Sequence, residues 1–189
     1  MILGKLTIAI QIHMPNYRRA FVPGATWFFT VNLLQRHGND LLLREIELLR
    51  QVIKNVRRKY PFHIDAWVVL PEHMHCVFTL PEGDSDFSLR WRLIKSAFSR
   101  ALPKTESLSA VRLAAGERGI WQRHYWEHLI RDELDFQRHV DYVHVNPLKH
   151  GLVQRVCDWP YSTFHRYVSE DVYPLDWCGD VVADVAGDE

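Results

Sequence analysis

The chain has 189 residues, which suits one domain and is short for two. Hydrophobic residues make up 47% of it, which excludes global disorder, and no apolar run approaches the ~20 residues that span a bilayer. Its three cysteines, Cys76, Cys157 and Cys178, are too widely spaced for a disulfide framework. With no cleavable signal peptide recognisable at the N-terminus, these features predict a cytoplasmic protein without a membrane partner.

The formal net charge of zero hides a strong asymmetry. Residues 169–189 contain seven acidic residues and neither Lys nor Arg, whereas residues 1–168 hold 23 basic and 16 acidic residues, a formal charge of +7. A basic body favours a polyanionic partner such as nucleic acid, although an ordinary solvated surface is an alternative. The acidic tail is either a solvated end or a segment that folds back over the basic face.

Hydropathy and turn signals predict the following elements in chain order. Residues 25–33 form a strand, and apolar residues at helical spacing predict a helix over 41–60 that ends at Pro61. Residues 62–70 and 73–80 form two strands joined by the short break Pro71-Glu72, which makes them antiparallel neighbours. A second helix covers 88–102, and residues 103–119 form a loop or insertion.

The C-terminal half continues the same alternation. Residues 120–130 are predicted to hold a fourth strand, and Asp132 is a candidate N-cap for a helix over 132–145 that stops at Pro147. Aromatic-rich residues 148–178 are expected to be irregular. The order strand, helix, strand, strand, helix, strand predicts an α+β fold, a ferredoxin-like βαββαβ sandwich with an antiparallel sheet, an extra helix and a C-terminal extension.

His73-Met74-His75 is the first candidate site. On a strand, residues i and i+2 face the same side, so the two imidazoles project together while Met74 points into the core. Two imidazoles on one face are half of a divalent-metal site. The alternative is chance, since the chain contains 11 histidines. Glu72 is expected on the opposite face and is a weaker ligand candidate.

Tyr142 and Asn146 form the second candidate site. At positions i and i+4 they share one face of the third helix. Tyr142 is a possible nucleophile, and the amide oxygen of Asn146 a possible metal ligand; the alternatives are a packing tyrosine and a helix stop. A phenol is protonated at neutral pH, so such a nucleophile needs a nearby cation, which the histidine pair would hold.

Basic residues supply candidate contacts to a nucleic-acid backbone. They lie in the N-terminal arm, along the second helix and after Pro147: Arg18, Arg19, Arg90, Arg92, Lys95, Lys149 and His150. Trp91, Trp121 and Tyr125 are candidates for base stacking, although a core role is the more frequent one for any single aromatic.

Three segments together resemble the REP-associated tyrosine transposases, which are single-tyrosine HUH-type transposases. They are PEHMH within residues 67–99, HVDYVHVNPLKHG within 120–153, and DWPYSTFH within 158–168. The resemblance runs from about residue 17 to residue 180. It divides the chain into an N-terminal extension (1–16), a transposase-like domain (17–168) and the acidic tail (169–189).

The resemblance implies a specific chemistry. His73 and His75 would hold Mg²⁺ or Mn²⁺, with Asn146 as third ligand where the wider group often has Gln, and Tyr142 would attack DNA to form a 5′-phosphotyrosine. The implied substrate is single-stranded DNA of REP elements, which fold as hairpins with a short conserved tetranucleotide at the foot, rather than a small molecule. It also implies a nucleoid-associated protein that acts as a monomer or a homodimer.

Two other functions remain open on the sequence. The chain could be a non-catalytic REP-DNA-binding regulator, although the intact set of His73, His75 and Tyr142 argues against this. It could also be a metal phosphoesterase that uses water in place of Tyr142 and forms no covalent adduct.

Overall fold

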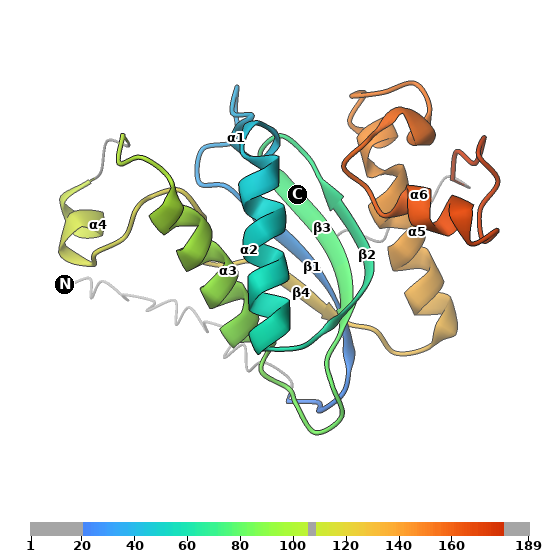
Figure 1. The fold of residues 1–189 in the computed structure, drawn as a ribbon, viewed down its shortest axis with the longest axis horizontal. Coiled ribbons are helices and arrows are strands. Elements are labelled where there is room, and N and C mark those ends of the chain that lie inside the picture. Colours follow the sequence, from blue (N-terminus) through green and yellow to red (C-terminus); the bar gives the residue numbers. More distant parts are fainter. Residues whose placement is uncertain (1–20, 106–108, 180–189) are drawn as a thin grey trace, which may run out of the picture.

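The computed structural model describes residues 21–105 and 109–179. In chain order the elements are β1 (Thr26–Asn32), α1 (Leu41–Arg44), α2 (Ile46–Lys59), β2 (His63–Val69), β3 (His73–Thr79), α3 (Phe87–Ala101), α4 (Ala110–Ala114), β4 (Trp126–Leu129), α5 (Glu133–Lys149), the 3₁₀ turn η1 (Val156–Asp158) and α6 (Phe164–Ser169) (Figure 1). Among these residues no helix combines the length and the apolarity that a membrane crossing requires.

One antiparallel sheet organises the chain, with strand order β2-β3-β1-β4. This order, with a helix-bearing connection between β1 and β2 and between β3 and β4, confirms the predicted ferredoxin-like βαββαβ arrangement. The register sets Thr30 opposite both His75 of β3 and Trp126 of β4. Side chains directly opposite one another lie on the same face, so these three residues form one row across the sheet.

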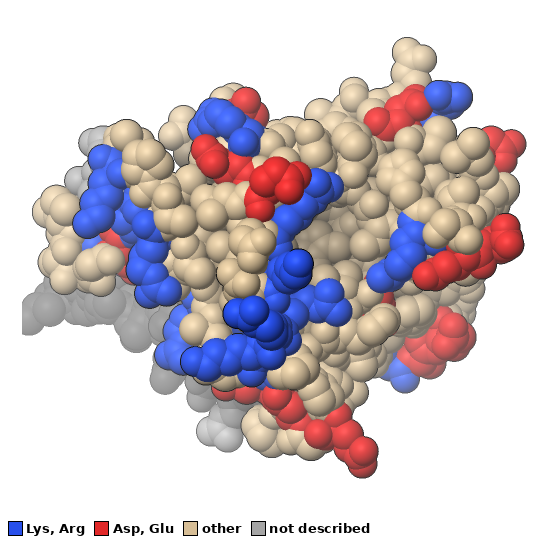
Figure 2. Space-filling view, viewed as in Figure 1, with Lys and Arg blue, Asp and Glu red and all other residues tan. Residues whose placement is uncertain are grey.

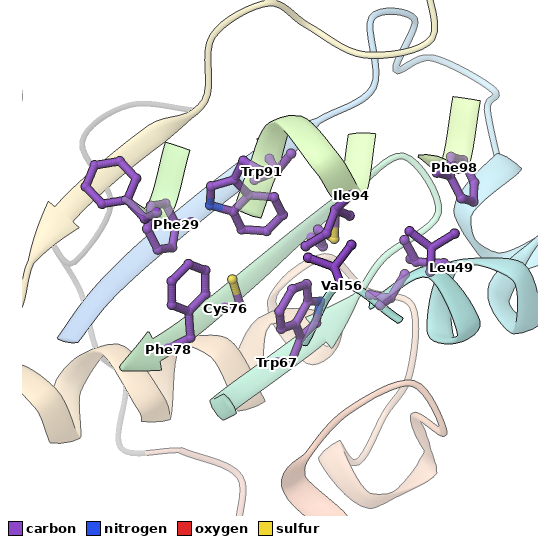
Figure 3. Packing of buried hydrophobic residues seen from close by; sticks show 14 of the residues in the cluster. Phe29, Leu49, Val56, Trp67, Cys76, Phe78, Trp91, Ile94 and Phe98 are labelled. Carbon is purple, nitrogen blue, oxygen red and sulfur yellow. The ribbon is translucent and has the colours of Figure 1, made fainter. Parts of the chain in front are cut away.

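Helices α2 and α3 cover one face of the sheet and enclose the larger apolar core (Figure 3). Alternate residues of β1 and β3, such as Phe29 and Phe78, point to this side, where their rings stack 4.6 Å apart. Trp91 of α3 is fully buried among them. Met74 also lies in this core, as the alternation predicted.

Helix α5 packs on the opposite face, against β2 and β3 (Figure 1). A smaller apolar cluster joins Val140 and Val143 of α5 to Phe28, Val68 and Val77 of the strands. Asp132 caps the helix, as predicted, by accepting a hydrogen bond from Asp135 N at 2.9 Å.

Two boundaries differ from the predicted ones. The fourth strand is only Trp126–Leu129, at the edge of the sheet beside β1, and earlier in the predicted range Trp121 makes an isolated bridge to Leu33. Helix α5 continues through Pro147 to Lys149. A proline removes one N–H, but here it stands in the last turn, where His150 N still bonds to Asn146 O at 3.0 Å, so little helix remains to be disrupted.

Smaller differences lie in the connections. The predicted helix over 41–60 is divided at Glu45 into α1 and α2. The loop over 103–119 contains the short helix α4, and the C-terminal extension contains η1 and α6. Residues up to 179 belong to the packed body, since Tyr173 and Trp177 stack 4.4 Å apart beside Phe164 of α6.

Basic side chains gather on the surface over the C-terminal half of α2 (Figure 2). The last turn of this helix carries Arg57, Arg58 and Lys59, where cations interact favourably with the helix dipole.

Candidate active site

His73 and His75 project from β3 toward α5, on the face opposite Met74. Both imidazoles are buried, and their ring centroids lie 4.9 Å apart at an interplanar angle of 86°. The strand alternation therefore places the two rings as the sequence predicted.

A hydrogen bond at Nδ1 orients each imidazole. His73 Nδ1–H donates to Glu72 Oε1 at 3.0 Å, and His75 Nδ1 lies 2.9 Å from Thr30 Oγ1. In the tautomer whose Nδ1–H makes these bonds, Nε2 carries the lone pair that coordinates a cation. The expected placement of Glu72 on the face opposite His73 is wrong, because Glu72 stands just before the strand, where alternation does not govern it, and its carboxylate hydrogen-bonds to His73. Its lower rank as a metal ligand stays a prediction.

Helix α5 and its C-cap carry three residues on this side, spaced four apart: Tyr142 and Asn146 in the helix and His150 at the C-cap. The Tyr142 ring lies 5.2 Å from the His75 ring, and the His150 ring lies 5.2 Å from the His73 ring. Asn146 stands between the two contacts on the same stripe of the helix. Helix and strand thus align so that Tyr142 meets His75 and His150 meets His73.

The donor atoms at this junction suit a divalent cation. Ring nitrogens of His73, His75 and His150 lie within 4.8 Å of one another. In the described part of the chain, His73 Nε2 and both amide atoms of Asn146 are buried without a hydrogen-bond partner. Each such orphan costs about 1–3 kcal/mol, so a cluster of them indicates a place for a ligand.

Electrostatics keep the His75 imidazole in the metal-binding form. Burial first, and then the electrostatic influence of the neighbouring His73, His150, Lys149 and Arg36 side chains, hold the pKa of His75 well below its usual value, so its ring is neutral. Burial alone would raise the pKa of Glu72, but the hydrogen bond from His73 lowers it on balance, so the carboxylate stays ionised. Lys149 Nζ lies 4.9 Å from the centroid of the buried Tyr142 ring.

The prediction that Arg90 contacts DNA is wrong, because its side chain is buried. Its side chain is only 2% exposed, and Nη1 donates to Asp84 Oδ1 at 3.0 Å while Nη2 donates to Pro61 O. Helical spacing could place Arg90 among the basic residues of α3, but it could not reveal that this side chain points inward against the loop before the helix.

Arg92 and Lys95, also predicted as DNA contacts, line a cavity of about 700 Å³. It lies between α3 and the segment from α4 to Tyr125, and its cations outnumber its single acid: Arg92, Lys95, Arg100, Arg112, Arg118 and Arg123 against Glu117. Lys95 Nζ donates to Gln122 O at 2.6 Å, so it also holds the cavity together. Arg18 and Arg19 lie outside the described residues.

The proposed base-stacking tryptophans are core residues. Trp91 and Trp121 are both buried, which agrees with the more frequent role for aromatics, while Tyr125 is half-buried. Sequence reasoning missed Thr30 and Asn32, which pair with His75 and His73 across strands. Only the register, unknown before the fold, could have identified them.

A second polar cluster joins β4 to the start of α5. His128 Nε2 lies 2.9 Å from Asp135 Oδ2, and His139 Nδ1 lies 3.1 Å from Asp135 Oδ1 and donates to the Asp135 backbone carbonyl at 2.7 Å. The two imidazoles stack 4.5 Å apart. The contact between His128 and the Asp135 carboxylate therefore fixes the edge strand to the helix that carries Tyr142.

No family model matches the chain. It is 51% identical over 175 residues to the REP-associated tyrosine transposase of Escherichia coli (strain K12), covering 93% of this chain and 98% of that one. A relative from Haemophilus influenzae, described as a "Putative REP-associated tyrosine transposase", is 43% identical over 176 residues, covering 93% of this chain and 99% of that one.

A solved structure described as "Structure of the REP associates tyrosine transposase bound to a REP hairpin" superimposes with a TM-score of 0.79 at 50% identity. It covers 93% of this chain and 98% of the other. With near-complete coverage in sequence and in fold, the chain belongs to the REP-associated tyrosine transposases.

Proposed function

We propose that the protein is a metal-dependent single-stranded DNA endonuclease and strand transferase that acts on REP hairpins through Tyr142. The observation that carries this proposal is the alignment of Tyr142, Asn146 and His150 on α5 with His75 and His73 on β3. It puts a candidate nucleophile next to a candidate metal site.

His73, His75 and Asn146 would hold the cation, with His150 as a fourth donor. When bound, a divalent cation polarises a phosphoryl oxygen and offsets the negative charge that develops on it. Of the two candidates, Mg²⁺ and Mn²⁺, the imidazole-rich donor set favours Mn²⁺, because Mg²⁺ prefers oxygen ligands and retains its waters.

The chain's own residues would carry out the transfer. The Tyr142 oxygen attacks phosphorus and loses its proton to solvent, while the bond from phosphorus to the 3′ oxygen breaks and that oxygen gains a proton. The products are a 5′-phosphotyrosine and a free 3′-OH, and the reverse reaction rejoins the strand. The Lys149 ammonium, 4.9 Å from the ring centroid, stabilises negative charge on the phenolate.

The basic cavity beside α3 would bind the phosphate backbone of the DNA. A relative 50% identical to this chain is described as bound to a REP hairpin, which supports the same substrate here. Backbone contacts would position the DNA, and unpaired bases near the site would supply sequence preference.

The test is a cleavage assay on labelled single-stranded hairpin DNA with Mn²⁺ or Mg²⁺, resolved on a denaturing gel. We expect a protein–DNA adduct with the wild type and none with Tyr142→Phe or with a chelator. Tyr167→Phe, which removes the hydroxyl of a half-buried tyrosine on α6, is the control and keeps the adduct.

Two outcomes would favour the other functions. Cleavage that survives Tyr142→Phe without an adduct indicates a phosphoesterase that uses water. Tight hairpin binding with neither cleavage nor adduct in either metal indicates a regulatory DNA-binding protein.

A further inference from the structure

Trp126 differs from the other tryptophans of the chain. Five of the seven are buried in the cores, and Trp177 is half-buried against Tyr173, whereas Trp126 is 40% exposed. A single exposed aromatic is common, so the exposure of Trp126 gains meaning only from where the ring lies.

The row across the sheet places this ring beside the candidate active site. Trp126 of β4 pairs with Thr30 of β1, and Thr30 pairs with His75 of β3. With strands spaced about 4.8 Å apart, the backbones at Trp126 and His75 are roughly 10 Å apart. That span corresponds to about one or two nucleotides of an extended single strand.

Contacts on the protein side hold the Trp126 ring in place. It stacks on His128 at 5.8 Å with an interplanar angle of 4°, and it meets the edge of Phe28 at 5.5 Å. Phe28 in turn contacts both His75 and Tyr142. His128 is itself anchored by Asp135 of α5. The ring is therefore oriented before any ligand arrives, which lowers the entropy cost of binding.

We propose that Trp126 stacks on one unpaired base next to the phosphate that Tyr142 attacks. Base stacking on aromatic rings is how proteins bind single-stranded nucleic acid without requiring one sequence. The inference rests on the proposed function, since it takes the DNA path from the positions of Tyr142 and His75. It assigns the single-strand contact to the α5 face of the sheet and leaves the hairpin backbone to basic residues elsewhere.

The test uses full-length protein carrying Tyr142→Phe, so that binding is measured without covalent capture. Two fluorescent hairpins are compared by anisotropy, one with four unpaired nucleotides at its foot and one with abasic sites at those positions. We expect Trp126→Ala to weaken binding of the first hairpin by roughly 5- to 100-fold and to leave binding of the second unchanged. Trp126→Phe retains a ring and restores most of the affinity.

Two controls separate stacking from loss of fold. Leu134→Ala removes another exposed apolar side chain, at the start of α5, and is expected to leave both affinities unchanged. Thermal unfolding of Trp126→Ala and Trp126→Phe shows whether either variant has lost its structure. Where Trp126→Ala is unfolded, Trp126→Leu takes its place, because it keeps an apolar side chain of substantial volume but offers no ring: it is expected to weaken binding of the intact hairpin and not of the abasic one, and equal binding of the intact hairpin by Trp126→Leu and the parent overturns the stacking role.

The outcomes also separate this inference from the proposed function. An equal loss on the intact and abasic hairpins, or no loss on either, overturns the stacking role. If the wild type forms no adduct but Trp126 still discriminates between the two hairpins, the stacking role holds and the strand-transferase function fails.

Discussion

The two faces of the sheet bury polar atoms of different kinds. Among the described residues, the buried atoms without a partner on the α2/α3 face are mainly indole N–H groups, those of Trp27, Trp67, Trp91 and Trp121. On the α5 face they are imidazole nitrogens and amide atoms: His73 Nε2, His139 Nε2, Asn32 Oδ1 and both amide atoms of Asn146.

The difference separates stability from function. A tryptophan that leaves one N–H unsatisfied still buries a large apolar ring, so the net effect of its burial is favourable. An amide or imidazole has little apolar surface to offset its unsatisfied atoms. The first face therefore contributes mainly to stability. On the proposed function, the second face tolerates the unsatisfied His73 Nε2 and Asn146 amide oxygen because a bound cation would satisfy them.

The largest effect on stability is expected on the first face. Trp91→Ala should lower the free energy of unfolding by about 3–5 kcal/mol, because it removes a fully buried ring that contacts Phe29 and Phe78. Urea unfolding followed by circular dichroism measures it. A loss below about 1 kcal/mol would mean that this face is not the stabilising one.

Asn146→Leu should have the opposite effect: activity is lost while stability is kept. Replacing a buried amide that has no partner with an apolar group of similar size should leave the free energy of unfolding unchanged or raise it by about 1 kcal/mol. Adduct formation should be lost. Asn55→Leu on the surface of α2 is the control and keeps the adduct. Strong destabilisation by Asn146→Leu would show that the amide is satisfied in the fold.

Thr30→Val should lower the affinity for the metal and change the free energy of unfolding little. It removes the hydrogen-bond partner of His75 Nδ1, and loss of such a support typically weakens metal affinity 10- to 100-fold. Calorimetric titration with Mn²⁺ measures it. Thr26→Val, which removes a Thr26–Thr79 bond at the other end of β1, should leave Mn²⁺ affinity intact.

The smallest effect at neutral pH concerns His144. Burial, followed by the charges of Arg166 and His165, lowers the pKa of His144 to about 3. Between pH 6.5 and about 3 the unfolded chain therefore binds the extra proton, so the free energy of unfolding falls as the pH falls through this range. Urea midpoints at pH 4.5 and 7.5 should differ less in His144→Phe than in the wild type. An equal difference would exclude His144 as the acid-sensitive group, and exposed His124→Phe is the control.

Much of the site could be predicted because local periodicity governs it. Alternation on β3 puts His73 and His75 on one side, and helical spacing puts Tyr142 with Asn146. Both patterns depend only on the periodicity of a single element, so both can be predicted before the packing of the elements is known.

What could not be predicted depends on partners that are distant in sequence. The supporting role of Thr30 follows from strand register, and the inward turn of Arg90 follows from the position of Asp84 and Pro61. From the sequence, His150 is a candidate DNA contact in a loop after Pro147; that α5 continues to Lys149, so that His150 meets His73, is visible only in the fold.

The division of the site between β3 and α5 has a consequence during synthesis. Tyr142 follows His75 by 67 residues, and the two meet only when α5 docks on the completed sheet. Such long-range contacts form late, since the closure of long loops precedes any gain from them. A nascent or partly unfolded chain therefore keeps the imidazoles and the tyrosine apart, and the candidate active site is assembled only in the native topology.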